Sequence, residues 1–240
     1  MKIFTFLFFF AILCTTSAKS QKTIKGSGYI LTQQREIPLY NSIEVNGPLR
    51  IFATPDELRP VIIEADNNLF PYIKTEIRHD TLRIFIEEQV YIKTFAVMNI
   101  FLSTPNISNL KVENGANIDG SRTPWKNKAT TIETNTGTRV KWHLETQMLQ
   151  VRAEGNTVLT LNGKANIFNL QLEQGALLEA GELKANQAIV KIAGASSKAT
   201  LDVSGSISYD ISQKGRLIYK GTPEVSSANL SSGAKVNRRK

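Results

Sequence analysis

The residues best suited to ligand chemistry are two tryptophans and a histidine in the middle of the chain. Trp142 and His143 follow Lys141, and Trp125 lies on the preceding segment, after Pro124. Exposed indoles beside basic groups are a common platform for stacking sugar rings. Trp125, Trp142 and His143 are therefore the candidate ligand-binding residues, with a glycan as the ligand. A structural role, in which the indoles cover the core or pack against a cap, is the favoured interpretation, and their exposure decides between the two.

Acidic residues offer the other route to chemistry, because polysaccharide hydrolases and lyases use paired carboxylates or a calcium-bound acidic cluster. In the second half of the chain the acids are spread out rather than clustered, although Glu113 and Glu133 could stack on one face. Surface solubility accounts for this spread at least as well. The sequence therefore predicts no catalytic residue, and we expect the protein not to be an enzyme.

Metal, cofactor and nucleic-acid sites are not predicted. The chain has two His residues and one cysteine, Cys14, too few for a zinc site. Leu13 stands before Cys14 where a lipidation site requires a small residue, so lipidation is the minority alternative. Neither a phosphate-binding loop nor a Gly-x-Ser-x-Gly nucleophile turn occurs. Lys and Arg alternate with Glu and Asp without an aromatic-rich ribonucleoprotein motif, which argues against a nucleic-acid partner.

A repeat that begins near Leu110 must position these residues. Apolar pairs two residues apart recur, such as Leu149 with Val151 and Leu170 with Leu172, and the residue between them is polar. The two members of a pair lie on the same face of a strand. A glycine follows each pair where a turn is expected. These turn glycines are Gly115, Gly137, Gly155, Gly175, Gly194, Gly215 and Gly233.

The turn glycines recur about every twenty residues, with strand-like alternation between them. This pattern is typical of a β-solenoid, in which each coil buries its apolar face against the next coil. Glycine suits the corners because the backbone there has positive φ or packs too closely for a side chain. The predicted fold is therefore all-β, a single-chain β-helix.

The N-terminal half, residues 21–109, is strand-rich but less regular. Ile43 and Val45 lie before Asn46-Gly47-Pro48, and a second apolar alternation follows. Two strands are expected on either side of this tight turn. The strands of this half are expected to cap one end of the solenoid, and the polar residues 231–240 to shield the other end.

The first twenty residues have the parts of a secretory signal. Lys2 is followed by an apolar run, residues 3–13, and then by small and polar residues. The run is too short to span a bilayer. Cleavage is expected after Ser20, with Ala18 or an uncleaved anchor as alternatives. The mature chain is then extracytoplasmic, in the periplasm, at the cell surface or secreted, and has no transmembrane segment.

The positive net charge of +8 is concentrated at the C-terminus. Four basic residues lie in the last six positions: Lys235, Arg238, Arg239 and Lys240. Residues 237–240 are interpreted as a solvated basic tail. The sharper alternative is electrostatic contact of this tail with an anionic surface.

The chain resembles the head GIN domain family, DUF2807, whose members are labelled putative auto-transporter adhesins and are common in Bacteroidetes. The resemblance rests on Gly26-Ser27-Gly28, on residues 40–47, 62–68 and 80–84, and on the turns Asn114-Gly115-Ala116 and Ser232-Gly233-Ala234. It covers essentially the whole mature chain. The family implies an extracytoplasmic, right-handed β-helix, with adhesion inferred by analogy and no established catalytic residues.

The predicted organisation is a signal peptide at residues 1–20 and a single head GIN domain at residues 21–236. The domain has a strand-rich half, residues 21–109, and a regular solenoid half, residues 110–236. The expected function is non-enzymatic adhesion or cell-surface interaction, with a glycan or a cell-surface protein as partner and no cofactor. The alternative is a carbohydrate-binding or carbohydrate-active protein that uses one face of the solenoid.

Overall fold

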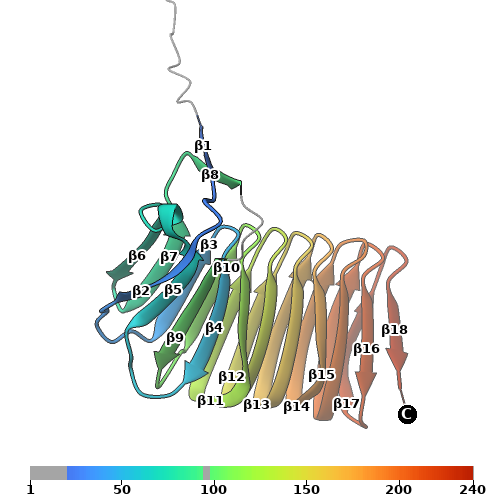
Figure 1. Ribbon diagram of the computed structural model, residues 1–240. Helices are drawn as coiled ribbons and strands as arrows, with labels where there is room; N and C mark the ends of the chain where they lie inside the picture. The colour runs from blue at the N-terminus through green and yellow to red at the C-terminus, as the bar shows by residue number, and fades with distance from the viewer. Residues whose placement is uncertain (1–20, 94–97, 240) are drawn as a thin grey trace, which may run out of the picture.

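The computed structural model describes residues 21–93 and 98–239. This part of the chain has 70% strand and 1% helix and forms a β-solenoid of about seven turns, with its strands stacked along a rod (Figure 1). The predicted all-β solenoid is confirmed. The expected signal sequence, Cys14 and Lys240 lie outside the described residues. Within the described ranges, no helix is long and apolar enough to cross a membrane.

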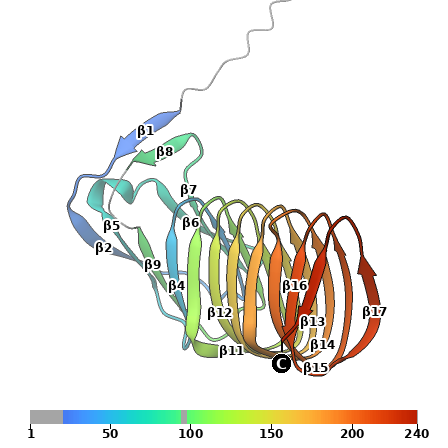
Figure 2. The same ribbon diagram turned by 90° about the vertical axis from the view of Figure 1, so that its right-hand side faces the viewer.

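Five long strands make the regular part of the solenoid. They are β11 (Asn117–Thr134), β12 (Arg139–Ala153), β13 (Val158–Glu173), β14 (Leu177–Ala193) and β15 (Lys198–Ser212). Neighbouring long strands pair in parallel, and Arg139 lies opposite Val158, one coil later. Each long strand passes around the coil, so its first part belongs to one face and its second part to the other (Figure 2).

The solenoid therefore has two faces, which we call the first and the second. The first face contains, in spatial order, β2 (Ile30–Arg35), β5 (Val61–Asp66), β9 (Asn99–Thr104), β4 (Arg50–Pro55), the first parts of the long strands, β16 (Arg216–Lys220) and β18 (Lys235–Arg238). The second face contains β6 (Ile73–Arg78), β7 (Thr81–Ile86), β3 (Ser42–Asn46), β10 (Asn109–Glu113), the second parts of the long strands and β17 (Glu224–Leu230).

The parallel stack continues into the N-terminal half. Strands β3 and β4 form on either side of the turn at residues 46–48, as predicted, but they do not pair with each other. Strand β3 pairs with β7 and β10, and β4 pairs with β9 and β11. This turn is therefore a corner of the solenoid. The coil made by β3 and β4 lies between the coil of β7 and β9 and the coil of β10 and β11, out of sequence order.

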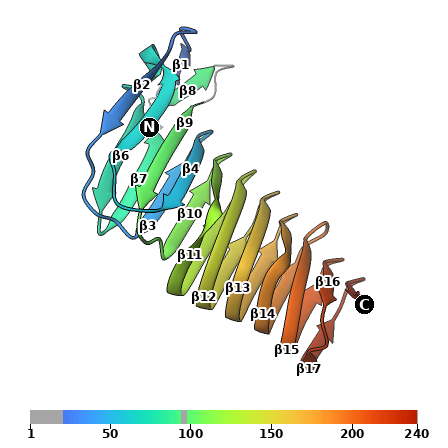
Figure 3. The ribbon, with the colours of Figure 1, turned by 60° about the horizontal axis from the view of Figure 1, so that its bottom comes forward.

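The two ends of the rod differ. At the N-terminal end, antiparallel strands cover the stack, because β5 pairs with β9, β2 with β5 and β6 with β7. The short helix η1 (Asn67–Leu69) joins β5 to β6, and β1 (Lys22–Lys25) pairs with β8 (Val90–Lys93) as a separate sheet. At the other end every residue of β17 is exposed. Part of the expected tail, Asn237 and Arg238, forms β18, which pairs with β16. Figure 3 shows β16 and β17 at this end of the rod, close to the C-terminus.

The apolar alternation fills the lumen of the solenoid. Leu149, Val151, Leu170 and Leu172 are all buried, and each packs above the equivalent residue of the previous coil. Leu170, for example, lies opposite Val151. Burial of these stacked side chains is the main stabilising contribution, since the mature region expected from the sequence has no cysteine for disulfides.

The turn glycines occupy the corners that follow the second face. Six of the seven have positive φ, as a corner requires of glycine. Gly215 differs, because Gln213 and Lys214 adopt positive φ in its turn. A side chain at Gly215 would lie 2.7 Å from Ile192 Cγ2, so close packing explains this glycine. Both physical reasons given for the corner glycines therefore occur.

Candidate functional site

The two candidate indoles lie inside the solenoid. Trp125 and Trp142 have no exposed surface, and their rings stack with centroids 4.8 Å apart and planes 16° from parallel. The Nε1 of Trp125 donates a hydrogen bond to the Gly120 carbonyl at 3.1 Å. Neither indole face is accessible to a sugar ring, so the pair serves the core, which is the structural role stated above.

The residues beside Trp142 point outward. In β12 the Lys141 side chain is exposed and the His143 side chain is half-buried. Val140, Trp142 and Leu144 are buried. The sequence carried a signal for this outcome. Trp142 is in phase with Val140 and Leu144 in a period of two, so it shares their inward face. His143 alone does not form a ligand site.

The most ordered set of polar side chains lies on the outside of the second face. We call it the charge ladder. In register order, from the N-terminal end, its members are Glu76, Arg83, Glu44, Lys111, Glu133 and Arg152. Acidic and basic residues alternate at each step. Opposite charges directly across from each other stabilise a sheet, so the charge ladder supports the strand register.

Arg83 is the centre of the charge ladder. Its Nη1 lies 2.6 Å from Glu76 Oε1, and its Nε lies 3.2 Å from Glu44 Oε2. The hydrogen bond with Glu44 is the main reason that the pKa of Arg83 is raised above its ordinary value. The guanidinium also lies over the Phe85 ring, 5.4 Å from its centroid. Both carboxylates thus pair with the same arginine.

The pairing of Glu113 and Glu133 differs from the expected stack of acids. Glu133 lies opposite Lys111 and not opposite Glu113, and its Oε1 is 3.6 Å from Arg152 Nη1. Glu113 instead accepts a hydrogen bond of 2.9 Å from Asn135 Nδ2. The first coil repeats after 22 residues, so residue 133 lies opposite residue 111 and not opposite residue 113. The sequence suggested the spread of charge but not which charges meet.

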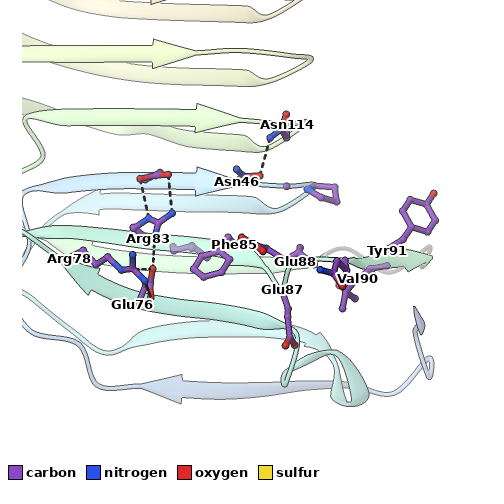
Figure 4. Close-up of a pocket in the computed structure, with 17 residues that line it drawn as sticks. Asn46, Glu76, Arg78, Arg83, Phe85, Glu87, Glu88, Val90, Tyr91 and Asn114 are labelled. Atoms are coloured by element: carbon purple, nitrogen blue, oxygen red, sulfur yellow. Dashed lines mark hydrogen bonds and ion pairs between the residues drawn. The ribbon is translucent and has the colours of Figure 1, made fainter. Parts of the chain in front are cut away.

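A cavity of about 640 Å³ lies at the N-terminal end of the charge ladder. Figure 4 shows Glu76, Arg78 and Arg83 on one side, and Val90 and Tyr91 of β8 on another. Asn114 Nδ2 donates a hydrogen bond to Asn46 Oδ1 at 3.1 Å on its rim (Figure 4). The lining combines charged groups with aromatic and aliphatic ones.

Three of the four acids that line this cavity, Glu44, Glu76 and Glu87, pair with basic side chains. Glu76 is bound by Arg83 and by Arg78, whose Nε lies 3.1 Å from Glu76 Oε1. Glu87 pairs with Lys74 at 3.4 Å. In the part of the chain that the structure describes, no group of three or more His, Cys, Asp or Glu side chains is placed to hold a metal ion. Glu44, Glu76 and Glu87 are therefore held by basic side chains at the wall of the cavity.

The family comparison agrees with this architecture. The family model described as "Putative auto-transporter adhesin, head GIN domain" matches residues 39–223. The chain belongs to the DUF2807 family. The match includes β3 and β4 in the N-terminal half, so the DUF2807 region begins with the out-of-order coils and not at the regular repeat. No curated protein matches the chain.

Solved structures share the DUF2807 solenoid. A putative adhesin from Bacteroides fragilis superposes with a TM-score of 0.82 at 21% identity, covering 90% of this chain and 99% of that one. A putative lipid binding protein from Parabacteroides distasonis superposes with a TM-score of 0.73 at 19% identity, covering 91% of this chain and 100% of that one. A putative adhesin from Parabacteroides merdae superposes with a TM-score of 0.70 at 18% identity, covering 91% of this chain and 100% of that one. At these identities the likeness shows the fold.

Proposed function

We propose that this DUF2807 protein is a non-enzymatic adhesion protein that binds a cell-surface component through an outer face of its solenoid. The observation that carries the proposal is the parallel stack of in-register strands, which aligns outward side chains in columns over about seven turns. Stacked repeats provide extended binding surfaces of this kind. The adhesin description of the family supports the same role.

The proposed location is outside the cytoplasm, in the periplasm, at the cell surface or in the medium. The signal-like first twenty residues and the adhesin description of the family support this location. The partner would be a glycan or a cell-surface protein. Sugar stacking on Trp125 and Trp142 does not contribute, since both indoles are buried, so recognition rests on the outer polar columns.

The test is a cell-binding assay with labelled protein expressed from the full chain. We expect saturable binding to intact bacterial cells, with displacement by excess unlabelled protein and none by an unrelated protein of similar size. Binding that does not saturate, or that unlabelled protein does not displace, contradicts the adhesion role. Turnover of a surface glycan that one carboxylate substitution abolishes contradicts the non-enzymatic role.

A further inference from the structure

One column of side chains on the first face lacks the alternation of the charge ladder. It consists of the first residue of β4, of each long strand, of β16 and of β18, directly after the turn. In register order its members are Arg50, Asn117, Arg139, Val158, Leu177, Lys198, Arg216 and Lys235. We call this set the basic column. It contains five basic residues and no acid, although each member lies directly beside the next.

The basic column is long and accessible. Seven steps of about 4.8 Å between neighbouring strands give it a length of about 34 Å. Arg50, Arg139, Arg216 and Lys235 are exposed, and Lys198 is half-buried. Lys198, Arg216 and Lys235 occupy three successive strands, so three positive charges follow one another with no residue between them.

Like charges directly opposite each other destabilise a sheet. Lys198 is partly compensated, because its Nζ lies 3.1 Å from Glu179 Oε1. Among the residues that the structure describes, the other four basic members have no ion pair within 4.0 Å. The same chain pairs its charges along the second face, so the basic column is an arrangement that folding alone does not favour.

The N-terminal part of the basic column borders a hollow. Arg50, Arg139 and Lys141 line a depression of about 310 Å³. Asp119 lies in the same depression, but its Oδ1 accepts hydrogen bonds from the Ser121 backbone N at 3.0 Å and from Ser121 Oγ at 2.6 Å. Among the described residues, none of these three basic groups has an ion pair within 4.0 Å, so they remain available to an anion from outside.

We propose that the basic column binds a linear acidic polysaccharide that lies along the rod. The inference rests on the proposed adhesion function and names the chemistry of its partner. The shape of the column favours a narrow chain over an anionic bilayer, because the adjacent column carries the acids Asp119 and Glu179 beside Lys141. A planar membrane would meet these acids as well. Val158 and Leu177, in the middle of the column, offer apolar contact to the C–H faces of sugar rings.

The test compares two triple variants with equal changes in net charge. The column variant is Arg139→Gln/Arg216→Gln/Lys235→Gln. The control variant is Lys128→Gln/Lys164→Gln/Lys184→Gln, at exposed positions off the basic column. Binding is measured to polygalacturonate, dextran sulfate, neutral dextran and phosphatidylglycerol vesicles. Denaturant unfolding of both variants checks folding, and Arg216→Gln/Lys235→Gln replaces the triple column variant if that variant is unfolded.

We expect the wild-type protein to bind at least one of the two anionic polymers, but not neutral dextran, with affinity that falls as salt is added. The column variant should bind about tenfold more weakly than wild type, because it loses several exposed charge contacts. The control variant should bind with an affinity within about twofold of wild type. Equal weakening in both variants, tighter binding to the vesicles, or no binding to either anionic polymer overturns the proposal.

The cell-binding assay separates this inference from the proposed function. A column variant that loses cell binding while the control variant keeps it supports both. A column variant that binds cells as well as wild type overturns the role of the basic column, while adhesion itself stands. Failure of the wild-type protein to bind cells, with polymer binding retained, contradicts the adhesion role and leaves polysaccharide binding supported.

Discussion

Gly120 allows the two indoles to meet in the lumen. Trp125 and Trp142 stack at 4.8 Å, and the Gly120 carbonyl accepts the Trp125 Nε1 hydrogen bond. A side chain at position 120 would overlap the Trp142 ring and lie 2.9 Å from Trp125 Nε1. Since Gly120 does not have positive φ, the requirement for glycine here is steric.

Gly120→Ala should therefore lower the free energy of unfolding by about 1–3 kcal/mol, the typical cost of overpacking a core. Gly181→Ala is the matched control, because the nearest atom to its added Cβ is Thr200 Cγ2 at 3.5 Å. We expect the control to change stability by less than about 0.5 kcal/mol. Urea unfolding followed by tryptophan fluorescence measures both variants. An unchanged stability of Gly120→Ala would mean that the stacked pair has room to move.

At the scale of the element, the strands of the second face are held in register by apolar contacts inside and by the charge ladder outside. The charge ladder joins β6, β7, β3, β10, β11 and β12 across segments that are far apart in sequence. Glu44 lies between two basic residues, Arg83 and Lys111, and its side chain is only 22% exposed. Because Glu44 is partly buried, its ion pairs contribute more to stability than fully exposed ion pairs do.

Glu44→Lys would place three positive charges on successive strands. We expect a loss on the order of 1–2 kcal/mol in unfolding free energy, because two attractive pairs become repulsive. Glu44→Gln should lose less unfolding free energy than Glu44→Lys, since it removes the attraction without adding repulsion. Denaturant unfolding at low and high salt measures both variants, and salt should reduce the loss. A loss that salt does not change would point to altered packing in place of charge.

At the scale of the whole molecule, burial depends on the position of a coil along the rod. Ile211 in β15 lies opposite Leu230 in β17, in the same column facing the lumen. Ile211 has no exposed surface, whereas Leu230 is 51% exposed. Each coil is covered by the next one, and β17 belongs to the last coil described. Aliphatic residues at equivalent places in the coil therefore contribute differently at the two positions.

Ile211→Ala should cost about 2–5 kcal/mol, the usual range for truncating a buried aliphatic side chain. Leu230→Ala should change stability by less than about 0.5 kcal/mol, as expected of an exposed position. Equilibrium unfolding of the two variants provides the comparison. A large loss in Leu230→Ala would show that another molecule covers the last coil in solution, and a dependence of stability on protein concentration would identify a second copy of the chain.

The sequence by itself determined the kind of fold and the position of its corners. Apolar residues two apart, such as Leu149 and Val151, can share a buried face only in a strand, and the recurring glycines set the length of each coil. The sequence also determined that Trp142 points inward, because Trp142 alternates in step with Val140 and Leu144 at a period of two residues. These features are local, because each depends on neighbours within one coil.

Only the tertiary structure decided which coils and which charges are neighbours. The placement of β3 between β7 and β10, and of β4 between β9 and β11, depends on pairing between segments distant in sequence. The register of Lys111 with Glu133, and of Lys198 with Arg216, depends on coil lengths that vary by several residues. A shift of one residue moves a side chain to the other face of the sheet. The charge ladder and the basic column therefore emerge only when the coils are stacked.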